Sequence, residues 1–353
     1  MKKTLLLTTA LIGTLSVLGS AQAETKISGE LKTTYKSQEA FALTQAQSGF
    51  TSERQINFAT KGTLNNGLAY EAGFSLEQDG GETGFDGGEG NYFNITSGNT
   101  TLEFGMDHIL NGDYAIVPRA GAPVNEEIGS IGGLTSAQLD TPVGLQYSQS
   151  IGEINGDAGI GIVQKIPSVG TLSFNYVPET GDTMNTADTS IPAQRTVSAA
   201  GKGKDAYEIF FAGDFGVPGL LVALNHSEVS KNANATQDFG VTSYGARYTM
   251  GNFSLGGEIA KFEQYDKSET ETKELGLTYK ISDKASVGIG RTVTEGTKTN
   301  GTSYTSDEEI DYLQVGYNLG GFTTQFSVIN ADNIGYTAAQ DATTYVVKLG
   351  AKF

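Results

Sequence analysis

The 353-residue chain contains no cysteine, and this absence removes several kinds of chemistry at once. Without cysteine the chain forms no disulfide in an oxidising compartment and offers no thiol nucleophile or soft-metal ligand. Only two histidines are present, His108 and His226, and they lie far apart in sequence. Neither has a metal-ligand partner at a recognisable spacing, so we expect structural or solvated roles for both.

Beyond Ala23 the chain also lacks any long apolar run. A membrane-spanning helix needs about 20 mostly apolar residues, so hydropathy alone would class the chain as soluble. Prolines number only 7, whereas 47 glycines, 16 tyrosines and 17 phenylalanines suit a chain of many strands and tight turns. A β-barrel escapes hydropathy windows because each lipid-facing apolar residue is followed by a polar residue that faces the lumen.

Basic residues are scarce relative to acidic ones, 23 against 40, which gives a net charge of −17. Removal of the first 23 residues takes away Lys2 and Lys3 and no acid, and leaves a charge of −19. Such acidity argues against nucleic-acid binding, which needs a basic surface. It repels anionic solutes and attracts cations.

The N-terminus has the features of a secretory signal peptide. Two lysines are followed by a short apolar segment from Leu5 to Leu18 and by the small-residue sequence Ala21-Gln22-Ala23. A membrane anchor is disfavoured because the apolar run is short and broken by Thr, Gly and Ser. We therefore expect cleavage after Ala23 and a mature chain of residues 24–353 that forms one barrel domain.

The C-terminal segment predicts a strand with one apolar and one polar face. Its apolar positions are Tyr345, Val347, Leu349, Ala351 and Phe353, and its interleaved positions are Thr344, Lys348, Gly350 and Lys352. This strand resembles the final strand of Gram-negative outer-membrane β-barrels. In that family the terminal aromatic is part of the signal read by the barrel-assembly machinery, so the resemblance gives Phe353 the role of an assembly signal.

The same alternation recurs along the whole chain, while helical periodicity is nearly absent. The sequence Asn65-Asn66-Gly67 between two alternating runs is a strong hairpin signal. Short turns are predicted at 65–67, 97–99, 166–170, 216–219, 251–252, 282–284 and 320–321. Longer polar segments run roughly over 37–52, 78–90, 107–154, 178–204, 230–238, 266–272, 295–309 and 332–342. Seven short turns and eight long connections link sixteen strands, the asymmetry that is typical of outer-membrane barrels.

One segment complicates this count. Residues 143–151 also alternate, with Val143, Leu145 and Tyr147 on one face, and a strand there would give seventeen. An even count with both termini on the same side of the membrane requires that this segment belong to the long central loop or extend a neighbouring strand. We assign it to the loop. Aromatic residues near strand ends, such as Tyr35, Tyr265 and Phe322, are expected at the membrane interfaces.

Sixteen strands, the terminal Phe353, the signal peptide and a longest loop after the fifth strand together resemble the general bacterial porins, most closely the trimeric diffusion porins of alphaproteobacteria. The resemblance implies an all-β transmembrane antiparallel barrel of 16 strands with its long third loop folded into the lumen. It also implies a homotrimer in outer-membrane lipid and lipopolysaccharide that passes ions and small hydrophilic solutes. The protein is then a channel and not an enzyme.

In that family, acidic residues of the third loop face a basic cluster on the barrel wall. The corresponding acidic residues here are Asp107, Asp113, Glu126, Glu127 and Asp140. Inward parity on the first, second and last strands gives Lys32, Lys61 and Lys348, which we expect to form one basic patch. The wall is poor in arginine, and Glu30, Glu71 and Glu103 share its inward face, so we expect weak cation selectivity. The alternatives are a solvated outer surface for the loop acids and the lumen mouth for the lysines.

Two acidic runs could in principle bind calcium, which favours clustered carboxylate oxygens. One is Asp79-Gly80-Gly81-Glu82 with Asp86 nearby, and the other is Asp307-Glu308-Glu309 with Asp311. Porins sometimes hold calcium near their loops. Neither run has an ordered ligand spacing, so we assign no metal site and no cofactor.

Two other classes of function compete with a channel. An outer-membrane barrel enzyme would need a nucleophile activated by a base, but only His108 and His226 offer an imidazole and no Gly-x-Ser-x-Gly sequence accompanies them. An exported β-rich adhesin or binding protein would explain the alternation and the acidity. It would not explain the terminal Phe353 or sixteen matched strands with one apolar face each.

Overall fold

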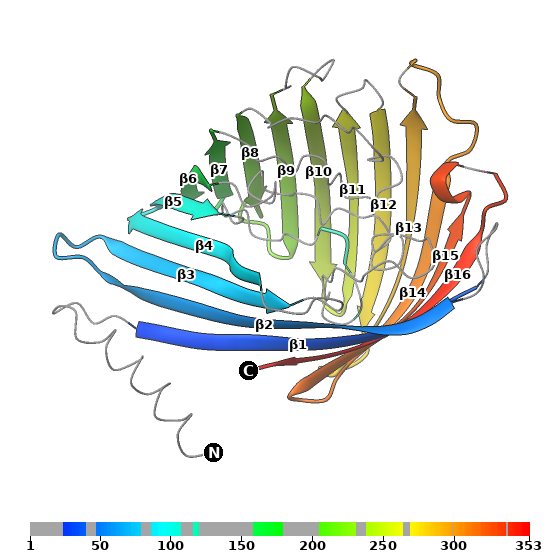
Figure 1. The fold of residues 1–353 in the computed structure, drawn as a ribbon, viewed down its shortest axis with the longest axis horizontal. Helices are drawn as coiled ribbons and strands as arrows, with labels where there is room; N and C mark the ends of the chain where they lie inside the picture. The colour runs from blue at the N-terminus through cyan, green and yellow to red at the C-terminus, as the bar shows by residue number, and fades with distance from the viewer. Residues whose placement is uncertain are drawn as a thin grey trace.

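The computed structural model describes residues 24–39, 47–78, 86–106, 116–118, 120, 158–178, 205–230, 238–263, 269–298, 300–336 and 338–353. The predicted signal peptide, residues 1–23, lies outside these ranges. The described chain forms one closed barrel in which every strand is antiparallel to its two neighbours (Figure 1). Closure leaves no strand edge unpaired, which is what a sheet needs if its outer face contacts lipid.

The predicted sixteen strands are confirmed. They are β1 (Glu24–Gln38), β2 (Gln47–Thr63), β3 (Ala69–Gln78), β4 (Asp86–Ser97), β5 (Thr100–Met106), β6 (Ala158–Ile166), β7 (Gly170–Val177), β8 (Ala206–Gly213), β9 (Leu220–Val229), β10 (Phe239–Met250), β11 (Phe253–Glu263), β12 (Glu269–Lys280), β13 (Ala285–Thr297), β14 (Glu308–Asn318), β15 (Phe322–Asp332) and β16 (Ala342–Lys352). A short 3-10 helix, η3 (Ile334–Tyr336), precedes β16. Because β5 pairs directly with β6, the barrel closes without residues 143–151, which lie outside the described residues.

The short connections gather at one end of the barrel, here called the turn end, and the long ones at the loop end. At the first turn, Gly67 has a φ of 86°, a backbone conformation that favours glycine. The backbone N–H of Leu68 donates to Oδ1 of Asn66 at 3.2 Å and completes the turn. The turn predicted at 65–67 is therefore confirmed, and it is formed by residue types that favour turns.

Five of the predicted long connections were drawn too wide. Residues 37–38 and 47–52 belong to β1 and β2, and the connections predicted at 78–90, 266–272, 295–309 and 332–342 likewise give up residues to β3, β4 and β12 to β16. Near the loop end the strands are polar on both faces, as in Glu269-Thr270-Glu271-Thr272 of β12. The backbone pairing between strands continues beyond the point where apolar and polar residues stop alternating. A prediction based on this alternation alone therefore ends each strand too early.

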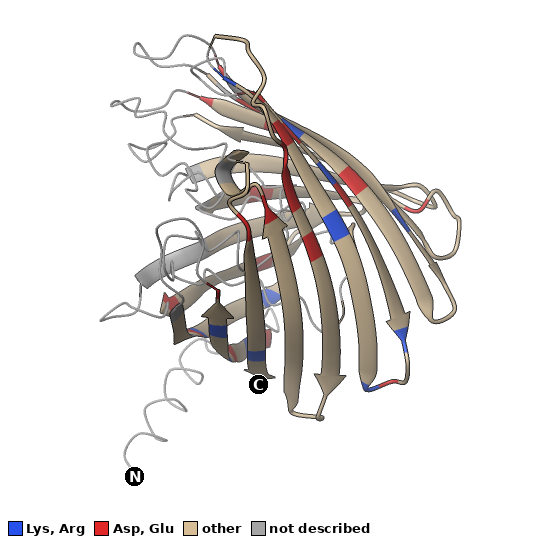
Figure 2. Ribbon diagram, turned by 90° about the vertical axis from the view of Figure 1, so that its right-hand side faces the viewer, with Lys and Arg blue, Asp and Glu red and all other residues tan. Residues whose placement is uncertain are grey.

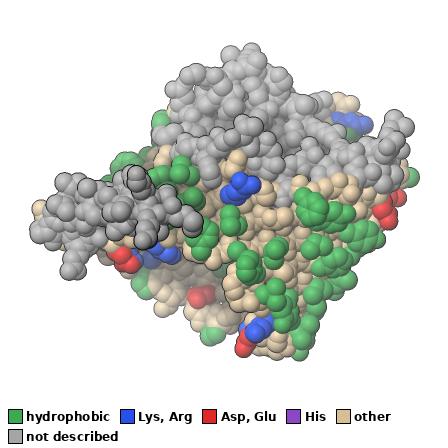
Figure 3. Space-filling view, turned by 60° about the horizontal axis from the view of Figure 1, so that its bottom comes forward, with side chains coloured by type: hydrophobic (Ala, Val, Ile, Leu, Met, Phe, Trp, Pro, Cys, Tyr) green, Lys and Arg blue, Asp and Glu red, His purple; other side chains and the backbone are tan. Residues whose placement is uncertain are grey.

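The outer face of the barrel is apolar, as predicted (Figure 3). On β16 the exposed fractions of Tyr345, Val347 and Leu349 are 40, 45 and 44 %. The intervening residues Val346 and Lys348 are buried inside the barrel. Outward aromatic residues lie near both ends of the wall, with Tyr35 toward the loop end and Phe322 at the turn end, whereas Tyr265 lies outside the described residues.

The terminal residue completes the seam between β1 and β16. The backbone N–H of Phe353 donates to the carbonyl oxygen of Gly29 at 3.0 Å, and the N–H of Gly29 donates back at 2.8 Å. The phenyl ring lies over Gly29, because a Cβ at that position would be 2.7 Å from Cε2 of Phe353. Phe353 as a whole is 67 % exposed on the outer face, and its ring contacts the backbone of β1 at Gly29.

Apolar side chains also occur inside the barrel, on β10, β11, β14, β15 and β16 and on η3. They form one buried cluster that comprises Val241, Ala260, Phe262, Ile310, Tyr312, Ile329, Ala331, Ile334, Ala342 and Val346. The lumen is therefore not uniformly polar. Among the described residues, none forms a helix long and apolar enough to cross a bilayer.

Candidate pore lining

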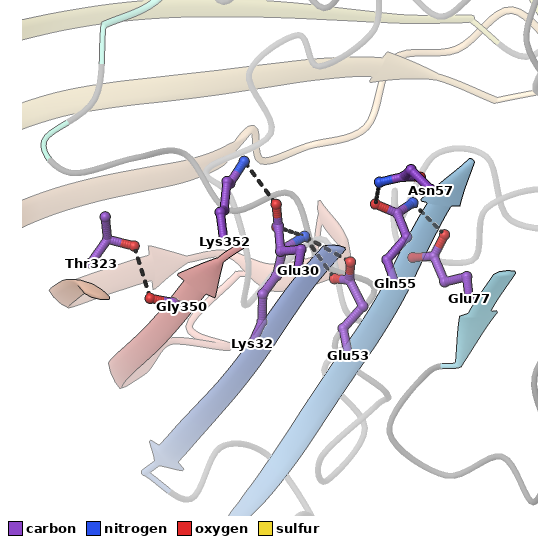
Figure 4. A network of polar contacts seen from close by, with 9 residues as sticks. All are labelled: Glu30, Lys32, Glu53, Gln55, Asn57, Glu77, Thr323, Gly350 and Lys352. Atoms are coloured by element: carbon purple, nitrogen blue, oxygen red, sulfur yellow. Dashed lines mark hydrogen bonds and ion pairs between the residues drawn. The ribbon is translucent and has the colours of Figure 1, made fainter. Parts of the chain in front are cut away.

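A chain of alternating charges lies on the inner face of the seam (Figure 4). The Lys352 ammonium contacts Glu30 at 2.7 Å, and Glu30 in turn contacts Nζ of Lys32 at 2.6 Å. Lys32 also donates to both oxygens of Glu53 on β2, at 2.7 and 2.9 Å. Each positive charge thus has a carboxylate beside it, and the group of four is neutral in sum.

The polar wall continues onto β3. The amide nitrogen Nε2 of Gln55 donates to Glu77 at 3.1 Å, and Nδ2 of Asn57 donates to Oε1 of Gln55 at 3.3 Å. The hydroxyl of Ser75 donates to Oδ1 of Asn57 at 2.6 Å. Linked side chains of this kind have fixed positions and present a polar surface to the lumen.

The predicted basic patch forms only in part. The register places Lys348 opposite Thr34, midway between Lys32 and Lys36 on β1, so these three lysines are neighbours on the inner face. Lys36 is buried and was missed by the sequence analysis, although it has the same parity as Lys32. It stands at the edge of the segment 37–52, which was assigned to a loop.

The third predicted member, Lys61, does not belong to this patch. It lies eight residues beyond Glu53, the register partner of Lys32, which is about 26 Å along β2. Its ammonium contacts Glu24 at 3.1 Å, and both side chains are well exposed at the turn end. The expectation of one patch of three was wrong because inward parity gives the face of a residue but not its height along the barrel.

Carboxylates occupy the inner face of the remaining wall. Glu103, Glu208, Glu258, Glu274 and Glu308 are all buried there. Glu208 accepts hydrogen bonds from Nδ2 of Asn175 at 3.1 Å and from the hydroxyl of Ser227 at 3.0 Å. The predicted inward position of Glu103 is confirmed, and Glu71 faces the same way and accepts a hydrogen bond from the Tyr92 hydroxyl at 3.1 Å. Away from the seam, carboxylates are thus the more frequent charged residues on the described inner wall.

A polar cavity of about 620 Å³ lies against the inner wall of β2 to β7 at the turn end. Its charged lining residues are Glu24, Lys61, Glu71, Glu103 and Lys165. The backbone register joins Lys61 to Glu71 and, through Asn94, Glu71 to Glu103. These paired residues form a row across the strands, and the row is inclined to the barrel axis because the strands are tilted.

The long connection between β5 and β6 enters the barrel where it is described. Ile116, Val117 and Ala120 are 2, 4 and 0 % exposed. Ile116 packs against inward-facing Phe210 and Ala223, and the N–H of Ala120 donates to Oε1 of Gln314 on β14 at 3.3 Å. The predicted constriction residues Asp107, Asp113, Glu126, Glu127 and Asp140 lie outside the described residues, as does His108.

The family is decided by sequence over most of the chain. A model of the Gram-negative porin family matches residues 8–306. This chain is a Gram-negative porin. It is accordingly a channel-forming barrel of the outer membrane rather than an enzyme.

Solved structures similar to this porin share its fold. An anion-selective porin from Comamonas acidovorans superposes with a TM-score of 0.66 at 14 % identity, over 94 % of this chain and 100 % of that one. A Rhodobacter blastica porin mutant gives 0.59 at 13 % identity, over 94 and 100 % of the two chains. A loop-deletion mutant of the Vibrio cholerae outer membrane protein OmpT gives 0.61 at 13 % identity, over 94 and 99 %. Among curated proteins, a sequence search finds no match.

The outer face of the porin carries a ladder of ion pairs on the loop-end side of its apolar surface. Figure 2 shows acidic and basic residues on neighbouring strands of the ribbon. Each cation of this ladder lies between two carboxylates. Lys261 contacts Glu263 and Glu269, Lys273 contacts Glu271 and Glu295, and Arg291 contacts Glu309 and Asp311. Toward the turn end, the outward positions on the same strands become apolar, as at Leu255, Leu275 and Leu313.

The second acidic run does not converge on a calcium site in the porin. Glu308 is buried on the inner face of β14, whereas Glu309 and Asp311 point outward to Arg291. Strand alternation sends neighbouring carboxylates to opposite faces. The first run, 79–82, lies outside the described residues, and the described part of the chain has no group of three His, Cys, Asp or Glu that could hold a metal ion. His226 is exposed on the outer face with Nδ1 2.9 Å from the Thr242 hydroxyl.

Proposed function

We propose that this porin is a passive diffusion channel for ions and small hydrophilic solutes, with a weak preference for cations. The observation that carries the proposal is the inner wall, where carboxylates lie on β2, β3, β5, β8, β11, β12 and β14. A polar lumen inside a closed barrel is sufficient for passive diffusion. No cofactor is required for such transport.

The preference for cations rests on how the charges are distributed. At the seam, the positive charge of Lys32 is offset by Glu30 and Glu53 within 3 Å. Along the rest of the wall, acidic residues outnumber basic ones, and the mature chain carries a charge of −19. Because an aqueous lumen is screened over about 10 Å at roughly 0.1 M salt, the preference should fade as salt rises.

The fold itself does not decide selectivity. The similar porin from Comamonas acidovorans is described as anion-selective, although its barrel superposes on this one. Selectivity must then come from the side chains that line each lumen, which differ between chains that are 14 % identical. We therefore base the proposal on the lining residues of this chain alone.

Conductance in a planar lipid bilayer tests the proposal. We expect stepwise ohmic currents, and in a salt gradient a reversal potential displaced toward the cation equilibrium potential. Replacement of the exposed lumen residue Glu71 by Gln should move this potential toward anions. Absence of current from correctly folded protein would exclude a channel, and an anion-selective wild type would exclude the charge argument while leaving the channel intact.

We further propose that the chain is exported, cleaved after Ala23 and assembled as a homotrimer through the barrel-assembly machinery, with Phe353 as the signal. The ion-pair ladder on β11 to β14 has the place and the mixed charge to contact lipopolysaccharide headgroups. Mass spectrometry of protein from outer membranes should give a chain that begins at Glu24. Native mass spectrometry in detergent should give three chains, and a stable monomer would contradict the trimer.

A further inference from the structure

Three glycines stand directly opposite one another across the inner wall of β11, β12 and β13. The register pairs Gly256 with Gly276 and Gly276 with Gly290, and all three face inward. Gly288, two residues before Gly290 on β13, also faces inward. These four residues, here called the glycine track, leave the wall without side chains across three neighbouring strands.

Residues 116–118 lie directly on the glycine track. A Cβ at Gly256 would be 2.9 Å from Cδ of Pro118 and closer still to the carbonyl oxygen of Ile116. A Cβ at Gly276 would overlap Cγ1 of Val117. Real Cβ atoms essentially never approach other atoms this closely, so the segment occupies the space that side chains would fill.

The contact continues along the segment in both directions. Ile116 packs against Phe210 of β8 and Ala223 of β9, and its Cγ2 is 2.8 Å from where a Cβ of Gly245 would lie. At the other end, the Ala120 nitrogen is 3.1 Å from the corresponding point at Gly288. The described residues of the segment, 116–118 and 120, therefore make contacts with strands from β8 to β14 and lie on the wall.

The far end of the track is closed by Tyr312 of β14. Its ring lies over Gly290, and its hydroxyl is 2.8 Å from the position of a Cβ at Gly276. The same hydroxyl donates to Oε1 of Glu274 at 3.2 Å, which fixes the ring across the sheet. The seat for the segment is thus bounded by a buried aromatic residue.

We propose that Gly256, Gly276 and Gly288 are positioning residues for conduction. They seat Ile116, Val117, Pro118 and Ala120 against the wall of β10 to β14, away from the opposite side of the barrel. In a ring of sixteen strands, that opposite side is formed by β2 to β7, where the polar cavity lies. The inference rests on the proposed channel function and adds to it which residues set the course of the open path.

Alanine substitutions at neighbouring positions give a matched test. In Gly276→Ala the new methyl group meets Val117 and should displace the segment into the lumen, lowering single-channel conductance by roughly 1.5-fold, because a packed segment cannot absorb the added volume in place. The control is Gly257→Ala on the outward face of β11, where a Cβ has 3.3 Å to its nearest neighbours. The control should conduct like the wild type.

A size exchange separates a lost seat from general damage to the fold. Val117→Ala removes the Cγ1 atom that meets Gly276, and Tyr312→Phe removes the hydroxyl that also lies close to it, so the triple variant Gly276→Ala/Val117→Ala/Tyr312→Phe should recover the wild-type conductance. Failure of the exchange to recover it, with both proteins assembled normally, would overturn the assignment.

A cross-link tests the seat without relying on current. Because the chain contains no cysteine, the pair Val117→Cys/Gly276→Cys can form only one disulfide within a chain. We expect it to form readily and to leave conductance unchanged, since it fixes the segment where it already lies. A folded protein that does not cross-link would overturn the seat. If neither the wild type nor any variant conducts although the cross-link forms, the proposed channel function fails and the position of the segment stands.

Discussion

The inner wall of the barrel is built in two different ways. On β16, β1 and β2 it carries alternating charges, from Lys352 through Glu30 and Lys32 to Glu53. On β11 to β13 it carries the glycine track, which is covered by residues 116–118. Both walls share the same apolar outer face. Contact with lipid therefore requires the same apolar pattern on the outer face of both walls. On the inner face, the charged wall suits contact with water and the glycine wall suits contact with the covering segment.

The largest effect is expected from breaking the charged wall at its seam. Deletion of Phe353 removes two backbone hydrogen bonds to Gly29 and leaves the end of β1 uncovered. We expect the amount of assembled porin in the outer membrane to fall several-fold, while secretion into the periplasm is little changed. Fractionation with immunoblotting measures both quantities, with Phe353→Tyr as the aromatic control. Normal assembly of the deletion variant would show that the terminal residue is incidental.

The second largest effect should come from Glu53→Ala. Lys32 and Glu53 have side chains only 10 and 8 % exposed, so loss of the Glu53 carboxylate removes one counter-charge of a largely buried ammonium. We expect the free energy of unfolding to fall by about 2 kcal/mol, and the reversal potential to move toward anions.

The matched control for this change is Glu295→Ala on the outer face. Its ion pair with Lys273 is about half exposed, with side chains 51 and 42 % accessible. Such a pair contributes at most about 1 kcal/mol, and it does not face the lumen. Equal effects of the two substitutions on the reversal potential would contradict the assignment of Glu53 to the pore.

A third prediction concerns the glycine wall. Tyr312→Phe keeps the ring over Gly290 but removes the hydrogen bond to the buried Glu274. We expect a loss of about 1 kcal/mol in unfolding free energy with little change in conductance, because the seat keeps its shape. Tyr317→Phe, outward on the same strand, serves as the control in denaturant titrations. A large conductance change in Tyr312→Phe would mean that the hydroxyl and not the ring bounds the seat.

The smallest effect is expected at the turn-end mouth. Lys61→Glu replaces an exposed ammonium that contacts Glu24, in a position where solvent screens its charge. The reversal potential should move slightly further toward cations, and the shift should disappear at high salt. Lys273→Glu on the outer face makes the same change in charge and should leave the potential unchanged. A salt-independent shift would contradict the solvent-exposed position of Lys61.

The outer wall was predictable from the sequence and the inner wall was not. The outward positions Tyr345, Val347 and Leu349 and the turn at Gly67 follow from residue alternation and turn chemistry, both of which are local. Lys36 was missed because β1 is polar on both faces near its end. The separation of Lys61 from Lys32 depends on the register between two strands, which alternation does not encode.

The glycine track was hidden for a related reason. Gly256, Gly276 and Gly290 come from three different strands, and only the register brings them into one row. Each alone reads as an ordinary strand glycine. Gly256 and Gly276 share the segment that covers them, which is far from both in sequence, whereas Gly290 lies under Tyr312. The sequence does contain a signal, because each glycine occupies an inward-facing position near the middle of its strand. This signal can be interpreted only when the strand register is known.

The pairing of Phe353 with Gly29 has a consequence for the order of folding. The contact that closes the ring joins residues separated by nearly the whole chain, and contacts of such long range form late because the loop that they close is entropically costly. Until then β1 and β16 are open sheet edges, able to pair with any other exposed strand. This porin is therefore most prone to aggregation during folding, before Phe353 pairs with Gly29 of β1.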